Sequence, residues 1–593
     1  MTVNEKITAL RVLLTSNKFD AYLIPSSDPH QSEYVAEHWS TRTWLSGFTG
    51  SAGTVIITSS HAGLWTDSRY FLQAEDELAS SEMVLHPQQV PHAPEHLQWL
   101  LAELPEGATV ACDGNLFSIA QIRGIERILA PKNIKLDYQK DLPGEIWKDR
   151  PNLPKYPFFE HEVKYAGMSR GEKLTQIRTE MKAQGANYHL VSTLDNIAWI
   201  FNIRSNDVDC NPVTIAYAVI GEREAFLFID EAKVPAALRT SFAEDGIRFH
   251  PYDGLEHFLG GLSESILLNP TTTSVKAFNS IRAAQLIEGT TISMSLKAIK
   301  NEVEVGHIKD AMVKDGVALT KLYRWLETEL DQREIPETEI AEQLAGFRKS
   351  QGDYHGESFA AIVGYQGNGA IVHYRAEEGK CAMVKKEGIL LLDSGGQYLN
   401  GTTDITRTTA LGAVTAEQKQ HYTLVLKGHI ALAKMQFPRG TVGIQLDAIA
   451  RQYLWEEALN YGHGTGHGVG FFLNVHEAPQ GFAASTTTSR GKTALVPGMF
   501  TSNEPGFYKT GAYGIRIENL VLTREAVKNE FGDFLKFETL TLFPIDQSLI
   551  EKSMLTPREI NWLNDYHALV FEKLAPAVDA SEKAWLKEKC AKL

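Results

Sequence analysis

Cysteine is scarce in this chain of 593 residues, and its four cysteines are widely scattered: Cys112, Cys210, Cys381 and Cys590. They form no CxxC pair, so the sequence offers neither a disulfide framework nor a cysteine-based zinc site. Isolated thiols of this kind are typical of a reducing compartment. We therefore expect a cytoplasmic protein.

Long apolar runs and basic runs are also missing. No stretch approaches the roughly 18 consecutive apolar residues of a membrane span. Residues 1–14 mix charged side chains with leucines at helical spacing, which predicts an amphipathic helix and not a signal peptide. The formal net charge is −15, and no Lys/Arg-rich run offsets it. We expect no nucleic-acid and no membrane partner, because both favour basic surfaces.

The length exceeds what one hydrophobic core supports and predicts roughly three or four domains. The apolar fraction of 43% is that of a globular protein. Prolines 151, 154 and 157 interrupt regular structure and predict a linker. Tyr22–Asp28 and Tyr188–Asp195 each lead from an apolar run to an aspartate and then to a tryptophan, a weak sign of a repeated α/β unit. We expect α/β (α+β) domains at 1–157, 158–300 and 301–593.

The third segment combines helix and strand signals. Asn301 and Glu304 form a potential capping box before an apolar stripe that predicts a long helix. Residues 388–392 predict a short buried strand that ends in Asp393, and residues 402–408 predict a second strand that carries Asp404. A hairpin through the glycine pair at 395–396 would bring the two carboxylates together.

Five residues that can bind metal follow one another in this segment: Asp393, Asp404, His467, Glu504 and Glu518. Oxygen ligands with a single imidazole favour hard or borderline cations such as Mn²⁺. A carboxylate has two oxygens to share between ions. The set therefore suits two metal ions better than one.

The local sequences support this interpretation. Asp393 would be costly to bury without a partner, and a cation offsets that cost. In the predicted strand, Asp404 shares a face with Thr406 and points away from Arg407, which disfavours a simple ion pair. His467 lies among alternating glycines, which allow positive φ and close backbone approach.

The two glutamates also lie in extended segments. Glu504 precedes a Pro-Gly turn. Alternation places Glu518 on the same strand face as Arg516, which predicts that this guanidinium holds or neutralises Glu518.

Three other motifs do not fit the chain. The glycines around His467 match neither the GxGxxG register nor its following helix and acid. The Gly491-Lys492-Thr493 run lacks the first glycine of a P-loop, because Thr486 occupies that position. His92 to His96 matches HxxEH, but Pro94 would break the helix that this motif requires.

Two further histidines are candidates, His373 and His476. A histidine by itself is more often structural than catalytic. A two-metal hydrolase, however, needs donors for the developing oxyanion and for the leaving nitrogen, and imidazole supplies both near neutral pH.

Taken together, these segments resemble the pita-bread metallopeptidase family, and within it the three-domain cytosolic Xaa-Pro aminopeptidases. The resemblance covers essentially the whole chain. It rests on the motifs at residues 44–53, 67–70, 194–199, 300–301, 392–395, 401–408, 463–470 and 503–506. It implies two creatinase-like α/β domains followed by a pita-bread catalytic domain with a C-terminal helical extension.

The resemblance also implies a dinuclear-metal aminopeptidase that releases the N-terminal residue from peptides with proline in second position. His467 and Glu504 would hold one metal and Asp393 the other, while Asp404 and Glu518 would bridge two ions, expected to be Mn²⁺. A hydroxide between the metals would attack. Glu504 would act as base or proton shuttle, His476 would polarise the carbonyl, His373 would contact the leaving nitrogen, and His463 would line the proline pocket. Arg516 joins the catalytic set. A homodimer is implied by the family only.

Alternatives remain at this stage. A prolidase would cleave only Xaa-Pro dipeptides, and a non-catalytic pita-bread module would bind peptides without metal. Methionine aminopeptidases are disfavoured because the two extra N-terminal domains would have no role. Phe507 and Tyr508 are aromatic candidates for the proline pocket, and the segment 484–493 is longer and richer in Ser and Thr than expected for the family.

Overall fold

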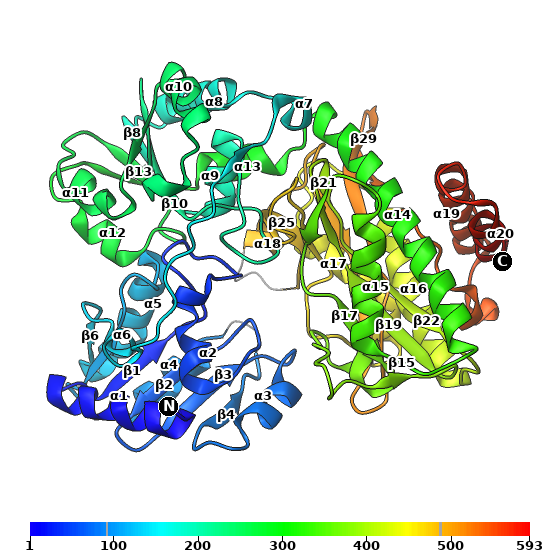
Figure 1. The fold of residues 1–593 in the computed structure, drawn as a ribbon, viewed down its shortest axis with the longest axis horizontal. Coiled ribbons are helices and arrows are strands. Elements are labelled where there is room, and N and C mark those ends of the chain that lie inside the picture. Colours follow the sequence, from blue (N-terminus) through cyan, green and yellow to red (C-terminus); the bar gives the residue numbers. More distant parts are fainter. Residues whose placement is uncertain (91–92, 485–488) are drawn as a thin grey trace. The chain divides into compact units, whose positions relative to one another are not determined.

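A computed structural model describes residues 1–90, 93–484 and 489–593. The chain forms two compact units (Figure 1). The first comprises residues 1–161 and 168–294, and the second comprises residues 162–167 and 295–593. The predicted domain boundaries at 157 and 300 stay predictions.

The first half of the first unit is built on a six-stranded sheet of order β4-β3-β2-β1-β5-β6. Its strands are β1 Ala21–Ile24, β2 Thr54–Thr58, β3 Ala62–Thr66, β4 Val84–Pro87, β5 Thr109–Cys112 and β6 Lys135–Asp137. Its α-helices are α1 Val3–Asn17, α2 Thr41–Ser46, α3 Phe71–Leu78, α4 Glu95–Glu103, α5 Ile119–Leu129 and α6 Leu142–Ile146. The predicted N-terminal helix is confirmed: Thr2 caps α1, and Ile7, Leu10 and Leu14 are buried on one face.

The second half repeats this layout, with strand order β12-β11-β10-β8-β13-β14. Its strands are β8 Tyr188–Val191, β10 Ala216–Gly221, β11 Ala225–Ile229, β12 Ile247–His250, β13 Ile266–Leu268 and β14 Leu286–Glu288, with the short pair β7 Phe159–Glu160 and β9 Ile203–Arg204 beside them. Its α-helices are α8 Arg170–Ala183, α9 Leu194–Phe201, α10 Ala236–Glu244, α11 Leu255–Gly260 and α12 Val275–Ser280.

The two sheets agree in pairing sense as well as in order. In each, the first strand pairs antiparallel with one neighbour, as β1 does with β2 and β8 with β10. It pairs parallel with the other neighbour, as β1 does with β5 and β8 with β13. The weak sequence echo between the two segments therefore reflects a repeated α/β topology.

The second unit begins with the short helix α7 Val163–Ala166 and the end of α13 Ile292–Ala298, followed by the long helix α14 Glu302–Leu330. The predicted capping box is confirmed, because the Asn301 side chain accepts from the Glu304 N–H and the Glu304 side chain accepts from the Asn301 N–H. The predicted apolar stripe is buried along α14: Ile308, Met312, Leu319, Leu322 and Leu326.

The second unit contains six more α-helices and sixteen strands among the described residues. The helices are α15 Glu337–Lys349, α16 Ala416–Ala433, α17 Gly443–Glu456, α18 Ser489–Lys492, α19 Pro557–Leu574 and α20 Ala580–Lys589. The strands up to residue 410 are β15 Ile335–Pro336, β16 Tyr354–Glu357, β17 Ile362–Tyr365, β18 Met383–Val384, β19 Ile389–Ser394, β20 Gly396–Tyr398, β21 Gly401–Thr402 and β22 Ile405–Ala410. The later strands are β23 Gln436–Pro438, β24 Gly466–Gly468, β25 Glu477–Phe482, β26 Phe500–Asn503, β27 Gly506–Lys509, β28 Tyr513–Arg516, β29 Asn519–Asn529 and β30 Gly532–Thr539.

Two sheets carry the helices of this unit. Leu322 of α14 and Leu344 of α15 share a core with Leu390 of β19, in the sheet β17-β19-β22. Leu426 of α16 shares a second core with Leu522 of β29, in the sheet β23-β30-β29-β26-β24-β25. Apolar faces of helices therefore cover both sheets, and strand ends of both supply the candidate ligands.

The predicted antiparallel pairing after Asp393 is confirmed, but two details of the prediction are wrong. The glycine pair at 395–396 does not form the turn, because Gly396 lies in β20 and the chain reverses at residues 399–400, between β20 and β21. β19 and β22 pair antiparallel, with Asp393 opposite Thr406. The continuous strand predicted for residues 402–408 is wrong, because β21 ends at Thr402 and β22 starts at Ile405. Asp404 lies in the break between them. Its backbone therefore lies outside the strand pairing of β19 with β22.

Several smaller predictions can be compared with the structure. The C-terminal helix α19 has the predicted cap at Thr556, with Pro557 at its start and Glu559 completing the capping box. Helix α4 starts after Pro94, while His92 of the rejected HxxEH motif lies outside the described residues. Of the long segment 484–493, residues 485–488, which include Thr486, likewise lie outside them. No helix within the described parts of the chain is both long enough and apolar enough to cross a membrane.

A buried charge triad ties the start of the second unit to the strand β25. Lys297 Nζ lies 2.8 Å from Glu477 Oε1, and Lys300 Nζ contacts the other carboxylate oxygen. All three side chains are at most 2% exposed. Glu477 opens β25 directly after His476, and its backbone pairs with Gly468, the neighbour of His467. The triad therefore holds the two strand segments that carry these histidines.

We predict that Glu477→Gln destabilises the protein by about 3–5 kcal/mol, because it leaves two buried ammonium groups without a counter-charge. Chemical denaturation measures the free energy of unfolding. Glu525→Gln is the matched control, because Glu525 pairs with Arg439 at the exposed surface. Exposed pairs contribute little. Equal stability of the two variants would contradict a stabilising role for the buried triad.

Candidate metal centre

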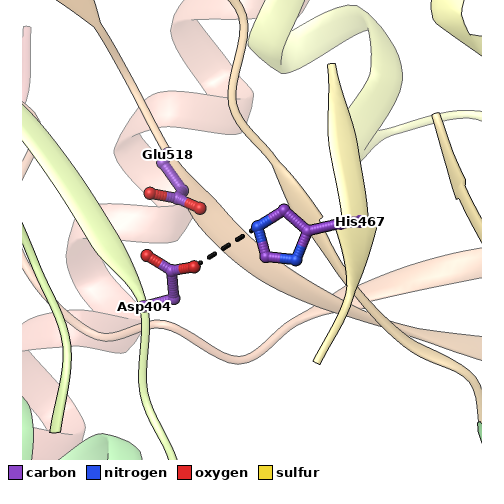
Figure 2. A group of neighbouring side chains, drawn as sticks. All are labelled: Asp404, His467 and Glu518. Atoms are coloured by element: carbon purple, nitrogen blue, oxygen red, sulfur yellow. Dashed lines mark ion pairs between the residues drawn. The ribbon is translucent and has the colours of Figure 1, made fainter. Parts of the chain in front are cut away.

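Three of the five predicted ligands converge on one point. Asp404, His467 and Glu518 each offer a ligand atom, and these atoms lie within 4.8 Å of one another. Figure 2 shows the carboxyl groups of Asp404 and Glu518 facing the imidazole of His467. Asp404 precedes β22, His467 lies in β24, and Glu518 lies between β28 and β29. Residues from distant parts of the chain thus meet in the buried interior.

Glu504 completes the surroundings of His467. The Nε2 atom of His467 lies 3.4 Å from Glu504 Oε1 and 3.5 Å from Asp404 Oδ2. Its Nδ1 atom lies 2.9 Å from the carbonyl oxygen of Gly468, which can only accept, so Nδ1 carries the proton. The Nε2 lone pair therefore faces the carboxylates and is the atom available to a metal.

Asp393 is held by a guanidinium. Arg516 Nη2 donates to Asp393 Oδ2 at 2.6 Å. The other oxygen, Oδ1, is buried and has no hydrogen-bond partner among the described residues. A buried carboxylate oxygen without a donor is costly, and a bound cation would satisfy it. This orphaned oxygen is the local observation that fits a metal.

The carboxyl groups repel one another. Burial raises the pKa of Asp404 well above its usual value, and the charge of Asp393 raises it further. Burial likewise raises the pKa of Glu518 well above its usual value, with Asp404 and Glu504 adding to the effect. The pKa of Glu504 is also raised, first by burial. Like charges this close cannot all ionise unless cations compensate them. The donor set, rich in oxygen with one imidazole, suits two hard or borderline divalent ions.

His467 needs no proton removed before it can bind a metal. Burial, with the neighbouring His476, lowers its pKa to about 3. The imidazole is therefore neutral at physiological pH, which is the form that ligates metals.

The predicted pairing of Arg516 with Glu518 is wrong. Arg516 ends β28 and binds Asp393, whereas Glu518 accepts a hydrogen bond of 2.8 Å from the Thr406 hydroxyl. The physical reason is that the strand stops at Arg516, so the alternation of faces does not continue to Glu518. Negative charge nearby outweighs the effect of burial on Arg516 and raises its pKa. It stays a cation.

The glycines around His467 provide space and not unusual backbone angles. The prediction of positive φ is wrong for Gly464, Gly466, Gly468 and Gly470, none of which has positive φ. A Cβ on Gly466 would overlap the carbonyl oxygen of Ser502, and one on Gly468 would lie 2.5 Å from that of Glu477. The prediction of close backbone approach is therefore confirmed, since β25 and β26 lie directly against this strand.

Three further side chains link the predicted site residues through hydrogen bonds: Ser502, Thr406 and Tyr508. The Ser502 hydroxyl accepts from the His467 N–H at 3.0 Å and donates to Glu504 Oε1 at 3.1 Å. Thr406 donates to Glu518 and accepts from Arg516 Nε at 3.1 Å. Tyr508, considered above only as a pocket aromatic, accepts from Arg516 Nη1 at 2.6 Å. The sequence signal for Tyr508 was its aromatic side chain close after Glu504.

Tyr508 joins His463 to Arg516. His463 Nδ1 lies 2.8 Å from the Gly464 carbonyl and therefore carries the proton, so Nε2 accepts from the Tyr508 hydroxyl at 2.8 Å. Both ring nitrogens of His463 are thus engaged within the chain. Burial raises the pKa of Tyr508 to about 12, which keeps its proton in place. The role of His463 in a proline pocket stays a prediction.

The other two histidines lie beside the ligand cluster. The ring of His476 meets that of His467 edge-on, with centroids 4.2 Å apart. His373 follows Val372, whose carbonyl oxygen lies 3.4 Å from Arg516 Nη2. The structure therefore connects eight of the nine predicted site residues, and it places the backbone that precedes His373 against Arg516. Their individual roles stay predictions.

Comparison with known proteins agrees with this arrangement. The model of metallopeptidase family M24 matches residues 306–525, and that of the C-terminal region of peptidase M24 matches residues 533–593. Two models of the creatinase/prolidase N-terminal domain match residues 6–150 and 149–304. Aminopeptidase P2 of Arabidopsis thaliana is 39% identical over 99% of this chain and 88% of its own length. The chain belongs to metallopeptidase family M24.

Further relatives of this M24 chain are similar over their whole length. Xaa-Pro aminopeptidase 1 of Dictyostelium discoideum is 38% identical over 99% of this chain and 96% of its own. The crystal structure of X-prolyl aminopeptidase from Caenorhabditis elegans, a cytosolic enzyme with a di-nuclear active site, superposes with a TM-score of 0.95. It shares 34% identity, and the match covers all of both chains. The predicted fold class, two creatinase-like domains followed by a pita-bread metallopeptidase domain, is confirmed.

More distant M24 structures share the fold alone. The prolidase of Pyrococcus horikoshii matches 63% of this chain and 99% of its own, with 22% identity and a TM-score of 0.50.

We predict that calorimetric titration of the metal-free protein with Mn²⁺ shows about two ions per chain and an affinity that rises with pH in the window from the ordinary carboxyl pKa range toward neutral pH. Asp404, Glu504 and Glu518 have raised pKa values, so the metal-free folded protein retains protons that the metal must displace. His467 has its pKa near 3 and adds no competition in this window. Buffers of different ionisation enthalpy report the number of protons released. The Glu518→Gln variant should release fewer. An affinity independent of pH, or a single ion per chain, would contradict this description of the site.

Proposed function

We propose that this chain is a dinuclear-metal aminopeptidase that hydrolyses the N-terminal Xaa-Pro bond of peptides and releases the N-terminal residue. One observation carries the proposal: a largely buried cluster of four carboxylates and one neutral histidine occurs in a chain that is similar, over nearly its full length, to proteins named as Xaa-Pro aminopeptidases. In a metal-free binding module, the desolvation cost of burying these carboxylates would not be compensated by any cation.

In this proposal, His467, Glu504, Asp393, Asp404 and Glu518 would together hold two divalent ions. The donor set favours Mn²⁺. Two such ions supply Lewis acidity and an activated water to peptide hydrolysis. All further roles fall to side chains of this chain.

Glu504 is the proposed base and proton shuttle. Its pKa is raised by burial, which brings a carboxyl group closer to the pH at which it can both accept and return a proton. Ser502 fixes its orientation through the hydrogen bond to Oε1. His476 is the proposed donor to the scissile carbonyl, and His373 the proposed contact of the leaving nitrogen. Arg516 keeps Asp393 in place.

The proposed substrate is a peptide with proline in second position. An Xaa-Pro bond lacks an amide N–H and has a fixed φ, so general peptidases cleave it poorly. We further propose that the protein is cytoplasmic and forms a homodimer, as the family resemblance implies. The similarity to the prolidase of Pyrococcus horikoshii covers only 63% of this chain, which makes a dipeptidase the weaker alternative.

We predict rapid, Mn²⁺-dependent release of alanine from Ala-Pro-Ala by the purified protein, little hydrolysis of Ala-Ala-Ala and slow hydrolysis of the dipeptide Ala-Pro. Product analysis by liquid chromatography measures each rate. His467→Ala should lose at least about 100-fold in kcat/KM, because one metal loses its imidazole ligand. Turnover of Ala-Pro alone would identify a prolidase instead. No turnover of any of the three peptides would reject the proposed function.

We predict a particle of twice the 65.9 kDa chain mass in light scattering coupled to gel filtration. The same mass should be found with and without Mn²⁺, because the dimer is proposed to form independently of the metal centre. A monomeric mass across a concentration series would refute the homodimer.

A further inference from the structure

A fully buried carboxylate outside the ligand cluster organises the loop that carries His373. Glu337, at the start of α15, is 0% exposed. Its Oε1 accepts from the Tyr365 N–H at 2.8 Å, and its Oε2 accepts from the Ala382 N–H at 2.9 Å and from the Tyr374 hydroxyl at 2.8 Å. Asn368 Nδ2 lies 3.1 Å from both oxygens. Every one of these donors is neutral.

The donors lie at both ends and in the middle of one segment. Tyr365 is the last residue of β17, and Ala382 immediately precedes β18. Asn368 and Tyr374 lie between them. One carboxylate therefore closes the whole loop 366–381 onto the start of α15. The loop begins with a 3₁₀ helix at Gln366–Ala370 and has no further helix or strand. Much of the rest is exposed, including Arg375, Glu377 and Lys380, and exposed loop segments are typically mobile unless they are held.

The same loop lies against the metal-ligand cluster. The Val372 carbonyl oxygen is 3.4 Å from Arg516 Nη2, the atom that also donates to Asp393. A Cβ on Gly369 would lie 3.2 Å from the backbone nitrogen of Gly514, so the loop touches β28 directly. The segment that Glu337 closes thus carries His373, and the residue before it contacts Arg516.

Tyr374 is the direct link between the carboxylate and the histidine. Its hydroxyl donates to Glu337 and accepts from Asn368 Nδ2 at 3.0 Å. The phenol is therefore held by one hydrogen bond that it donates and one that it accepts. Since Tyr374 follows His373 in the chain, a fixed phenol restricts the backbone from which the imidazole projects.

We propose that Glu337, acting through Tyr374, is a positioning residue that holds His373 in its working orientation. The proposal rests on the proposed function, in which His373 contacts the reacting peptide. Neither Glu337 nor Tyr374 touches the substrate. Misplacing a catalytic group by about 1 Å can cost roughly 100-fold in rate, so a positioning device of this kind is kinetically significant.

The test is a double-mutant cycle with Tyr374→Phe, His373→Ala and the double variant, measured on Ala-Pro-Ala. Tyr374→Phe should lower kcat about 10-fold and change KM less than about twofold, because the folded pocket remains and only His373 is loosened. In the His373→Ala background, the same change should have no further effect. Such non-additivity is expected only if the tyrosine acts through the histidine.

Tyr365→Phe is the matched control. It keeps the backbone N–H that bonds to Glu337 and removes a hydroxyl that does not contact that carboxylate, so kcat should stay near that of the wild type. Thermal unfolding of each variant checks folding. If Tyr374→Phe fails to fold, Asn368→Ala replaces it in the cycle, since it removes the other side-chain donor.

Two outcomes overturn the proposal while the proposed function stands. One is an equal loss of kcat from Tyr374→Phe with and without His373. The other is an unchanged kcat in both His373→Ala and Tyr374→Phe. Absence of activity in the wild-type protein would instead reject the proposed function, so the two failures are distinguishable.

Discussion

The structure depends on one constraint: four carboxyl groups are buried around a single imidazole, and their negative charges must be balanced. Arg516 compensates one of them by binding Asp393 at 2.6 Å. Burial, with the repulsion between the carboxyl groups adding to it, raises the pKa values of Asp404, Glu504 and Glu518. Such a cluster is stable when ionised only if divalent cations join it, because isolated buried charge is far too costly. The metal chemistry and the stability of the site therefore have the same electrostatic origin.

The surrounding fold meets this constraint with hydrogen bonds from neutral groups and with close backbone packing. Ser502 and Thr406 each contact two parts of the site, so neither carboxylate that they bind is free to turn away. Glycines at 466 and 468 let three strands approach where a methyl group would collide. At the start of β25, Glu477 joins two buried lysines, and at the start of α15, Glu337 closes the His373 loop. Each buried carboxylate thus has its own stabilising partners. Asp393 binds a guanidinium, Glu477 binds two ammonium groups, and Glu337 accepts hydrogen bonds from neutral donors.

Much of this could be predicted from sequence because the signals are local. The capping boxes at Asn301 and Thr556, the buried strand before Asp393 and the glycine run around His467 each depend on residues within a few positions of one another. One error, positive φ at the glycines around His467, arose because glycine permits such angles without requiring them. Two others occurred where a strand stopped. The prediction for residues 402–408 treated a broken strand as continuous, and the pairing of Arg516 with Glu518 assumed alternation beyond the end of β28. Strand ends are set by long-range pairing, which local pattern does not contain.

The sequence by itself determined which residue types can bind metal, their order, and the family to which their motifs belong. Only the tertiary structure decided which partner each residue has: Arg516 with Asp393, Thr406 with Glu518, Tyr508 with His463, and Glu337 with Tyr374. The physical reason is range. Ligand chemistry belongs to each side chain and can be read one residue at a time. Hydrogen-bond partners, by contrast, come from strands and loops that lie from 37 to 123 residues apart along the chain and meet only after folding.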